Sequence, residues 1–308
     1  MPGGARGLCF SRRAIRVIPF DRRVTPARPD LAARHLQGQV AAARFVDGTA
    51  REVRDDSAPL RRAPAPDAPL DTEALKGERV TVYETDQEGW CWAQLERDAY
   101  VGWLPASALA QPGPPATHAV SVLRTLAFPG PSITLPPVAA WSLGCRLAVL
   151  RTEGPLAATS SGWVPLRHLA PLDAHEADFV AVAERFLGVP YVWGGKTSLG
   201  IDCSGLVQVA LQACGAACPR DSDMQERALG EAVAADVAGL RRGDLVFWKG
   251  HVAIVRDADT FLHATAFHMM VAIEPIGDVT RRVAGEGGGA IRAVKRLPPR
   301  LDSGAPQT

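Results

Sequence analysis

The chain has 308 residues, which is enough for two or three domains that each bury a core of their own. Its 33 acidic and 34 basic residues nearly cancel, so no large field of one sign favours nucleic acid or a membrane surface as a partner. No stretch of the sequence approaches the ~20 apolar residues that cross a bilayer. A small or locally charged ligand fits this composition better.

Cysteines stand at positions 9, 91, 145, 203, 214 and 218. They have neither the paired spacing of a zinc site nor the density of a disulfide-stapled secreted domain, which is typical of a reducing compartment. The arginine-rich start contains Ser11-Arg12-Arg13, as in a twin-arginine export signal, but Ala14–Phe20 is too short and too interrupted for the apolar part of such a signal. We expect a cytoplasmic monomer without metal or cofactor, with export as the alternative.

The first segment, residues 1–44, is predicted to be an arm that braces the rest. Residues 1–29 hold prolines and arginines without a periodic pattern, so we expect them to be irregular. Asp30 can cap a short helix that continues through Leu31 and Leu36 to Ala43. Gly38 weakens this helix.

Residues 45–111 change to short runs with the alternation and the β-branched and aromatic content of strands. These runs are Glu52–Arg54, Glu78–Tyr83, Gly89–Leu95 and Tyr100–Pro105. Four prolines, at positions 59, 64, 66 and 69, lie between the first two runs and predict a long loop there. The pattern indicates a small antiparallel barrel.

A second set of short strands, within residues 116–172, follows the proline-rich hinge 112–115. The end of this set repeats the end of the first. Gly102-Trp103-Leu104-Pro105 with Leu109 is matched, 60 positions later, by Gly162-Trp163-Val164-Pro165 with Leu169. Such a repeat predicts two similar modules. Both resemble the bacterial SH3-like domain, whose closing strand often carries this Gly-aromatic-hydrophobic-Pro sequence.

Residues 173–308 are predicted to form an α+β domain, with helices first and a strand meander after them. Asp173–Glu176 is typical of a capping box, and the helix that it opens should end at Gly188. A glycine-broken loop then delivers Cys203 to the first turn of an apolar helix that runs to Cys214. Strands are expected at 244–248, 251–255, 260–265, 271–274 and 291–296, with a tight Lys249-Gly250 turn between the first two.

Cys203 and two strand histidines form a candidate catalytic set. A cysteine acts as a nucleophile only as the thiolate, and a helix N-terminus lowers the thiol pKa because its free N–H groups favour an anion. Period-2 alternation places His251 and His263 on faces that antiparallel pairing can bring together. One imidazole could then reach the thiol as general base while the other orients it.

Each member of this set has a plainer interpretation. A cysteine at the start of an apolar helix can be a small buried hydrophobe, and a histidine in a strand is more often structural than catalytic. A zinc site made from one cysteine and two histidines is a further alternative, although it would need another ligand or an activated water.

Three separate blocks of sequence resemble the NlpC family of cell-wall cysteine peptidases. They read Pro190-Tyr191-x-Trp193-Gly194-Gly195 with Asp202-Cys203-Ser204-Gly205-Leu206-Val207, then Pro219-Arg220-x-Ser222-x-x-Gln225, then Gly243-Asp244-Leu245-Val246-Phe247 with His251-Val252-Ala253-Ile254. The resemblance implies a papain-like core in which Cys203 is the nucleophile, His251 the base and His263 the third member. It also implies that Tyr191 contributes to the oxyanion hole.

The order of two SH3-like modules and a peptidase resembles the γ-D-glutamyl-L-diamino acid endopeptidases. The resemblance implies a murein tri- or tetrapeptide as partner, with a free N-terminal L-alanine that the first module helps to enclose. The substrate-lining positions it implies are Trp193, Asp202, Ser204, Arg220, Asp221 and Ser222. Tyr100 of the first module is added because its hydroxyl could reach the amine, together with one acidic side chain among Asp67, Asp71, Glu73 and Glu78.

Two other functions fit the same sequence. The papain-like core could act as an amidase or acyltransferase on substrates other than murein peptides. Alternatively, the chain could be a wall-binding protein whose SH3-like modules hold peptidoglycan.

Overall fold

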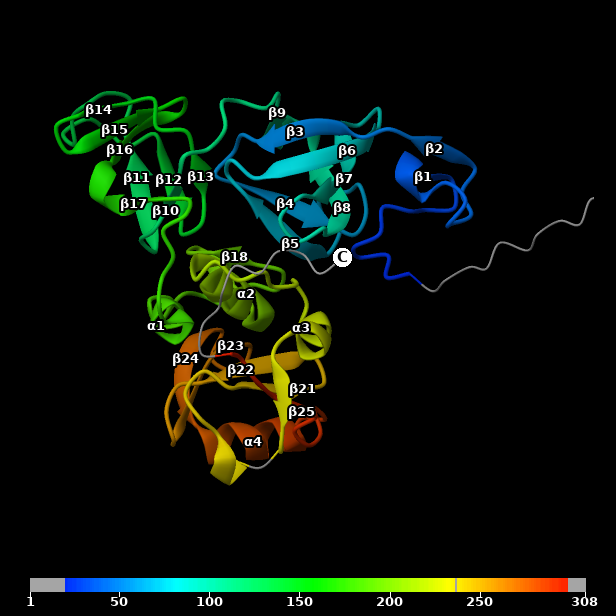
Figure 1. Cartoon of the computed structure of the whole chain (residues 1–308), viewed down its shortest axis with the longest axis vertical. Helices are drawn as coiled ribbons and strands as arrows, with labels where there is room; N and C mark the ends of the chain where they lie inside the picture. The colour runs from blue at the N-terminus through cyan, green and yellow to red at the C-terminus, as the bar shows by residue number, and fades with distance from the viewer. Residues whose placement is uncertain (1–19, 236, 299–308) are drawn as a thin grey trace, which may run out of the picture.

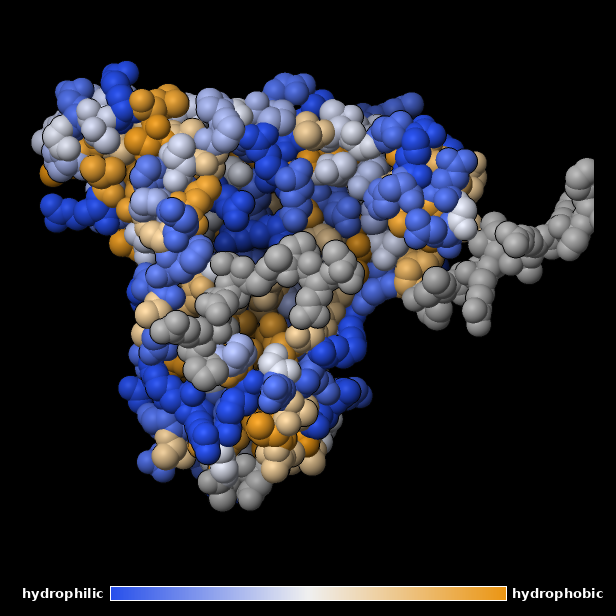
Figure 2. Space-filling view, viewed as in Figure 1, coloured by the Kyte–Doolittle hydropathy of each residue, from blue (hydrophilic) through white to orange (hydrophobic). Residues whose placement is uncertain are grey.

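The computed structural model describes residues 20–235 and 237–298, and the predicted irregular start at 1–19 lies outside them. The structure has two layers: the sheet modules lie side by side in one, and the domain that carries Cys203 forms the other (Figure 1). Hydrophilic residues cover most of the face in Figure 2, and hydrophobic residues gather at the outer corner of the second module. No helix within the described residues is long and apolar enough to cross a membrane.

The N-terminal segment contains short parallel strands, β1 (Leu31–Ala33) and β2 (Arg44–Val46), and a 3-10 turn, η1 (Arg34–Leu36). The predicted helix from Asp30 to Ala43 is therefore wrong. Residues 31–33 are all buried in extended conformation, and Leu31 packs against Trp92 of the first module. Packing on both faces of this short stretch outweighs its helical propensity.

The first module is a seven-stranded antiparallel sheet in the order β5-β4-β8-β7-β6-β3-β9. Its strands are β3 (Thr49–Val53), β4 (Ser57–Arg61), β5 (Leu70–Leu75), β6 (Arg79–Thr85), β7 (Trp90–Leu95), β8 (Val101–Pro105) and β9 (Leu109–Ala110). The four expected runs are confirmed as strands. The expected long loop is wrong, because β4 and β5 lie within it. Pro59 is tolerated in β4 because β4 meets β8 only at Arg61↔Trp103, so its missing N–H leaves no gap in that ladder.

The second module consists of three small antiparallel sheets, in the strand orders β13-β10-β17, β11-β12 and β14-β15-β16. Its strands are β10 (His118–Val120), β11 (Arg124–Ala127), β12 (Ala139–Ser142), β13 (Arg146–Leu147), β14 (Arg151–Glu153), β15 (Leu156–Thr159), β16 (Gly162–Pro165) and β17 (Leu169–Pro171). The sequence repeat is also a structural repeat. In the first module β8 leads through η2 (Ala106–Ala108) into β9, and here β16 leads through η3 (Leu166–His168) into β17. Closure of either module into an SH3-like barrel stays a prediction.

The third domain is a six-stranded sheet between helices, in the order β20-β25-β21-β22-β23-β24. Its elements are α1 (Phe179–Glu184), the hairpin β18 (Lys196–Thr197) and β19 (Gly200–Ile201), α2 (Cys203–Ala213), α3 (Ser222–Ala228), β20 (Glu231–Val233), η4 (Val237–Gly239), β21 (Leu245–Trp248), β22 (His251–Val255), β23 (Thr260–Thr265), β24 (Met270–Pro275), α4 (Ile276–Gly285) and β25 (Ala293–Arg296). α1 and α2 pack on one face of this sheet and α4 on the other. The strands of the predicted meander are confirmed, whereas α3 and α4 were not predicted.

The start of α1 differs from the prediction. Asp178, not Asp173, is the N-cap, and its carboxylate accepts hydrogen bonds from the Val180 N–H at 2.8 Å and the Ala181 N–H at 3.3 Å. The predicted capping box at 173–176 is wrong because the chain there is still crossing from the second module. Gly188 follows the helix with φ +79°, as expected of a residue that redirects the chain.

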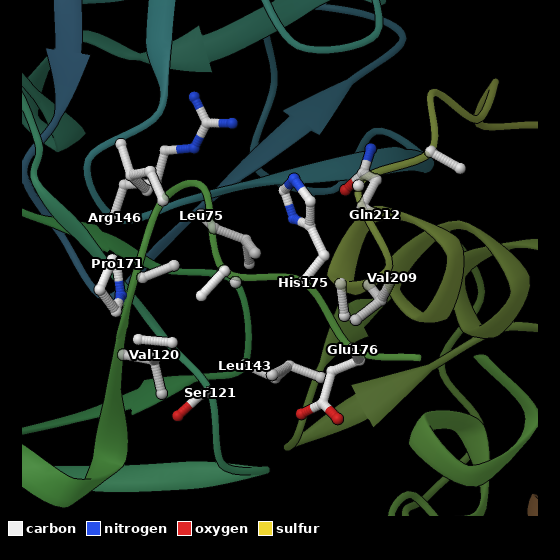
Figure 3. A pocket seen from close by; sticks show the side chains of 18 of the residues that line it. Leu75, Val120, Ser121, Leu143, Arg146, Pro171, His175, Glu176, Val209 and Gln212 are labelled. Carbon is white, nitrogen blue, oxygen red and sulfur yellow. The ribbon is translucent and has the colours of Figure 1, made fainter. Parts of the chain in front are cut away.

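The three units meet at a buried ionic cluster around Glu78. Lys196 Nζ lies 3.4 Å from both carboxylate oxygens of Glu78, and Arg97 Nη1 lies 3.3 Å from Oε1. Beside the cluster is a cavity of about 390 Å³ whose lining includes Arg97 of the first module, Arg146 of the second and His175 of the third domain (Figure 3). The layers are thus joined through charged groups as well as apolar contacts.

Candidate functional site

The nucleophile candidate stands at the first position of α2, where the sequence predicts it. Asp202 is the N-cap, and its Oδ1 accepts the Gly205 N–H at 2.7 Å, which satisfies one of the free donors of the first turn. The other oxygen, Oδ2, accepts the Gly194 N–H at 2.8 Å and so fixes the loop before the helix. Cys203 is 7% exposed and packs against Val252 and Leu262 of the sheet.

Arg220 holds this turn from behind. Its guanidinium donates to both oxygens of Asp202, at 2.9 and 2.7 Å, and to the Ser204 hydroxyl at 2.9 Å. Its Nε also donates to the Thr72 hydroxyl on β5 at 2.8 Å, which ties the turn to the first module. Asp202, Ser204 and Arg220 are therefore brought together, but each already has buried partners. Arg220, which the resemblance implies as a substrate-lining residue, does not line the cavity that contains Cys203. An ammonium that approaches Asp202 would share the carboxylate with Arg220.

The two histidines lie side by side on the sheet, as the strand alternation predicts. His251 Nε2 is 2.8 Å from His263 Nδ1, and the ring centroids are 5.0 Å apart. His263 is 1% exposed, and its Nε2 is 2.8 Å from Oε2 of Glu274 on β24. Because His251 Nε2 is engaged by His263, only Nδ1 of His251 remains to face another group.

The electrostatics of the pair differ from the sequence expectation. Burial, together with the charge of Asp202, raises the pKa of the Cys203 thiol to about 12, and this outweighs the favourable effect of the helix N-terminus. Burial and the neighbouring His263 lower the pKa of His251 to about 3. The resting groups are thus a neutral thiol and a neutral imidazole.

Cys203 and His251 line two cavities that meet at Gly250. Cys203 lies in a cavity of about 730 Å³, and His251 and His263 line a neighbouring one of about 440 Å³. The thiol lies beside the backbone N–H of Val252, the residue that follows His251. Among the described residues, no hydrogen bond joins the thiol to the His251 ring. Cys203 and His251 therefore lie near each other but line different cavities.

The larger cavity is formed by the third domain, by the first module and by the N-terminal segment, which sequence reasoning missed. Its lining includes Tyr191, Trp193, Asp202, Cys203, Ser204, Asp221 and Ser222 of the third domain, Asp71 and Tyr100 of the first module, and Arg22 and Arg23 of the N-terminal segment. Trp193 is 63% exposed at its rim. Burial raises the pKa of Tyr191, and the charges of Cys203 and Asp202 add to this, so its hydroxyl stays a hydrogen-bond donor.

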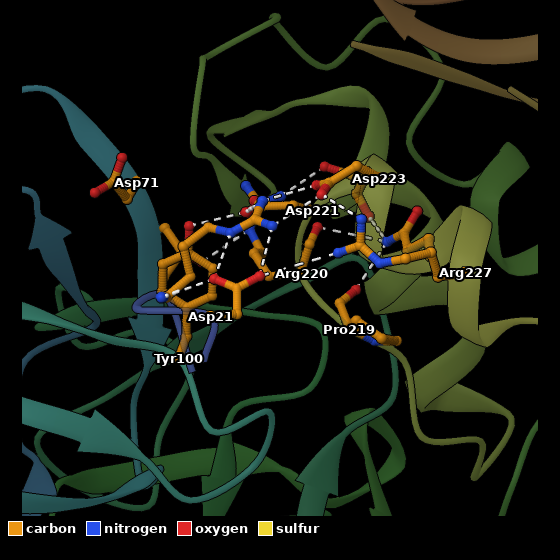
Figure 4. Close-up of polar contacts among 12 residues, drawn as sticks. Asp21, Asp71, Tyr100, Pro219, Arg220, Asp221, Asp223 and Arg227 are labelled. Atoms are coloured by element: carbon orange, nitrogen blue, oxygen red, sulfur yellow. Dashed lines mark hydrogen bonds and ion pairs between the residues drawn. The ribbon is translucent and has the colours of Figure 1, made fainter. Parts of the chain in front are cut away.

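One end of this cavity is acidic. The Tyr100 hydroxyl donates to Asp221 Oδ2 at 3.0 Å, and Asp71 lies near enough to raise the Tyr100 pKa further, after burial and Asp221 (Figure 4). Of the four acidic candidates in the first module, Asp71 is the one that lines the cavity. Asp67 is exposed elsewhere, Glu73 accepts the Lys196 N–H, and Glu78 belongs to the buried cluster.

Arg23 closes this acidic end from the N-terminal segment. Its Nη1 lies 2.7 Å from Asp221 Oδ2 and 2.7 Å from Asp223 Oδ1, while Nη2 lies 2.7 Å from Asp21 Oδ2 (Figure 4). The sequence gives little sign of this role, because Asp21-Arg22-Arg23 is one of several charged runs in a stretch without periodicity. The segment predicted as an irregular brace is therefore a wall of the site.

No group of three or more His, Cys, Asp or Glu side chains in residues 20–235 and 237–298 is arranged to hold a metal ion. His251 and His263 are in hydrogen-bond contact with each other, and Cys203 lies beside the backbone of Val252. Residues 188–280, which contain all three, match the model of the NlpC/P60 family. The chain is a cysteine peptidase with an NlpC/P60 domain. Residues 60–109 of this NlpC/P60 peptidase match the model described as the bacterial dipeptidyl-peptidase Sh3 domain.

Several relatives share this arrangement. The NlpC/P60 peptidase is 27% identical over 242 residues to a γ-D-glutamyl-L-lysine dipeptidyl-peptidase of Bacillus cereus, covering 67% of this chain and 71% of that protein. It is 28% identical over 221 residues to the protein of the same name from Bacillus subtilis, covering 63% of this chain and 72% of that one. Dipeptidyl-peptidase 6 of Lysinibacillus sphaericus is 32% identical over 121 residues, which cover 38% of this chain and 44% of that enzyme.

A solved structure of an NlpC/P60 family protein from Bacillus cereus has the same fold. It superposes with a TM-score of 0.67 at 22% identity and covers 81% of this chain and all of that one. The likeness therefore includes the sheet modules as well as the peptidase domain.

Proposed function

We propose that this peptidase hydrolyses the γ-D-glutamyl-L-diamino acid bond of murein peptides that have a free N-terminal L-alanine, releasing L-Ala-γ-D-Glu. The observation that carries the proposal is the shape of the cavity that contains Cys203. It has the nucleophile at one place and an acidic end, made by Asp71, Tyr100 and Asp221, at another. The Bacillus relatives are named γ-D-glutamyl-L-lysine dipeptidyl-peptidases, which supports the choice of a γ-D-glutamyl bond to a diamino acid.

The acidic end suits an α-ammonium. Burial raises the pKa of Asp221, although Arg220 and Arg23 oppose this. Burial thus disfavours the ionised carboxylate, and the ammonium of a bound substrate would stabilise it. Tyr100 is a neutral donor whose oxygen can also accept a hydrogen bond from the ammonium. Arg23 closes the space beyond Asp221, so a longer or acylated N-terminus would meet a guanidinium instead of a carboxylate.

The reaction that we propose is acyl transfer through a thioester. His251 Nδ1 takes the proton of the Cys203 thiol as sulfur attacks the γ-carbonyl carbon of D-glutamate, and the carbonyl electrons move to oxygen. Tyr191 donates a hydrogen bond to this oxyanion, where one well-placed donor is worth roughly 3 kcal/mol of barrier. The C–N bond then breaks as the imidazolium protonates the departing amine. Water, deprotonated by His251, attacks the thioester and frees the dipeptide and the thiol.

The biological role that follows from this substrate is recycling of murein peptides in the cytoplasm. A free N-terminal L-alanine arises only after the glycan has been removed from the peptide. Ser204 and Ser222, which line the cavity near Cys203, could hydrogen-bond the α-carboxylate of D-glutamate.

Cleavage of matched peptides tests the proposal. Purified protein is incubated with L-Ala-γ-D-Glu-meso-diaminopimelate, the L-lysine analogue and the N-acetylated form of each, and the products are identified by mass spectrometry. We expect L-Ala-γ-D-Glu from the free peptides and a kcat/KM lower by on the order of 100-fold for the acetylated ones, because an acidic pocket is left without its cation. Cys203→Ala should abolish release. No cleavage of either free peptide would contradict the proposal and favour an amidase or acyltransferase.

A tyrosine pair within the first module provides the matched control. Tyr100→Phe removes the hydroxyl at the acidic end and should raise KM about 3- to 10-fold with little change in kcat. Tyr83→Phe removes a hydroxyl bonded to Gln94, away from the cavity, and should leave both constants unchanged. Binding to intact sacculi that is unaffected by Cys203→Ala, without any hydrolysis by the native protein, would instead favour a wall-binding protein.

A further inference from the structure

The hydrogen-bonded pair of His251 and His263 continues to a third side chain, Glu274. His263 Nε2 lies 2.8 Å from Glu274 Oε2, and both groups are buried on β23 and β24. Glu274 is itself held in place by Arg282 of α4, which donates to Oε1 and Oε2 at 2.7 Å each, and by His268 at 3.1 Å. The Arg282 guanidinium stands 4.1 Å above the ring of Phe267. The carboxylate therefore has one orientation, set from three sides.

This chain of contacts fixes which nitrogen of each ring carries a proton. Glu274 is ionised, because Arg282 and the histidines lower its pKa although burial alone would raise it, so it can only accept. His263 must then donate from Nε2, and burial lowers its pKa so that Nδ1 keeps a lone pair. His251 must in turn donate from Nε2 to that lone pair. The lone pair of His251 is therefore on Nδ1, the nitrogen that the His263 contact leaves free.

We infer that Glu274 is a positioning residue for the peptidase reaction: through His263 it holds His251 in the tautomer that can accept the thiol proton, and its charge stabilises the imidazolium that results. This inference rests on the proposed function only in taking Cys203 as nucleophile and His251 as base. Glu274 does not line the cavity that contains Cys203, so it acts without touching the substrate.

Replacement of Glu274 by glutamine keeps the size of the side chain but removes its charge and changes which atom faces His263. In Glu274→Gln the side-chain carbonyl should face Arg282, and the amide NH₂ would then donate to His263 Nε2. That reverses the tautomer of His263 and then of His251, whose Nδ1 would carry a proton and could no longer act as base. We expect kcat to fall on the order of 10- to 100-fold, within the ~10²- to 10⁴-fold that general base catalysis supplies, while KM stays within twofold. Glu274→Asp keeps the charge and should recover part of the activity.

A substrate-independent readout distinguishes this inference from the choice of substrate. The rate at which iodoacetamide alkylates Cys203 is measured from pH 5 to pH 10 in a background where the other cysteines are buried or replaced. Native protein should react at neutral pH, because His251 takes the thiol proton. Glu274→Gln should react far more slowly at neutral pH, with its rate rising only toward the alkaline end of the range, because the thiol must then ionise unaided and burial raises its pKa. If the peptides are not cleaved but this shift is seen, the substrate proposal fails and the role of Glu274 stands.

Asp244 supplies the matched control. It is a buried carboxylate of the same domain that binds Arg296 through two contacts of 2.7 Å, as Glu274 binds Arg282. Asp244→Asn should lower the unfolding midpoint by a similar amount and leave the alkylation profile and kcat of the folded protein unchanged. Equal kcat and equal alkylation profiles in folded Glu274→Gln, Glu274→Asp and Asp244→Asn would overturn the inference. If Glu274→Gln does not fold, the comparison of Glu274→Asp with Asp244→Asn decides it in the same way.

Discussion

Replacement of Arg220 by methionine should destabilise the peptidase domain and misplace its nucleophile. Arg220 is 1% exposed and is the cationic partner of Asp202, to which it donates two hydrogen bonds. Methionine fills much of the same volume but leaves the carboxylate with two backbone N–H groups and the Ser204 hydroxyl. Removing one partner of a buried pair typically costs about 3–5 kcal/mol, a large part of the ~5–15 kcal/mol that stabilises a domain.

Activity should fall as well, because Asp202 caps the helix that begins at Cys203. Without the two Arg220 hydrogen bonds the Asp202 carboxylate is free to rotate, so it holds the Gly205 N–H and the Gly194 loop less firmly. Urea unfolding followed by circular dichroism measures the stability, and peptide release measures kcat. The double variant Asp202→Asn/Arg220→Met, which has no orphaned charge, should recover part of the stability that Arg220→Met loses.

The control is an arginine with equally short contacts but at the surface. Arg256 pairs with Glu184 at 2.9 Å, and the two side chains are 36% and 28% exposed. Arg256→Met should cost at most about 1 kcal/mol. If Arg220→Met costs no more than Arg256→Met, the reasoning about the buried clamp is refuted.

Four further outcomes are expected. Gly205→Ala should destabilise the protein although alanine usually favours a helix, because a Cβ would lie 2.4 Å from the backbone oxygen of Gly195; an unchanged melting temperature would contradict this. Glu78→Gln should cost about 3–5 kcal/mol, since the pKa of Glu78 is lowered by Lys196 and Arg97 against its burial and both cations would lose their anion; a loss below 1 kcal/mol in urea unfolding would show otherwise. As the pH is lowered, KM for free peptides should rise, because only the ionised form of Asp221 attracts the ammonium. The rise should begin above pH 3.8, the ordinary pKa of Asp, because the pKa of Asp221 is raised. A pH-independent KM from pH 4 to 7 would exclude this role. Burial lowers the pKa of His251 from 6.5 to about 3, so between these values the unfolded chain takes up a proton that the folded chain does not. The contribution of His251 to the free energy of unfolding is therefore complete above pH 6.5 and falls by about a few kcal/mol toward pH 3. In His251→Gln the loss of stability in acid should be smaller.

The parts of the fold that the sequence predicts well are those set by local pattern. Alternation predicts β22 and β23, and with them the adjacency of His251 and His263. The apolar run after Cys203 predicts α2, because a single buried helix reads as a continuous hydrophobic stretch. The Gly-Trp-x-Pro repeat predicts two similar modules, and in the structure each copy is a strand that leads through a 3-10 turn into another strand.

The parts that the sequence does not predict depend on distant contacts. Leu31 is extended because Trp92 and Val101 cover it, and nothing within residues 30–43 shows this. Glu274 lies in a predicted strand, but its link to His263 depends on the cross-strand register and on Arg282 from a helix that was not predicted. The thiol pKa was expected to fall from a local argument about the helix N-terminus, whereas burial from the whole domain raises it.

The contact between Arg23 and Asp221 joins residues 198 positions apart. Because domains fold in turn as the chain is synthesised, the N-terminal segment and first module can take shape before the residues that carry Cys203 and His251 exist. The wall that limits access is then present when the nucleophile first becomes competent. On this order of assembly, the proposed limit on which peptides reach Cys203 would be in place from the first turnover.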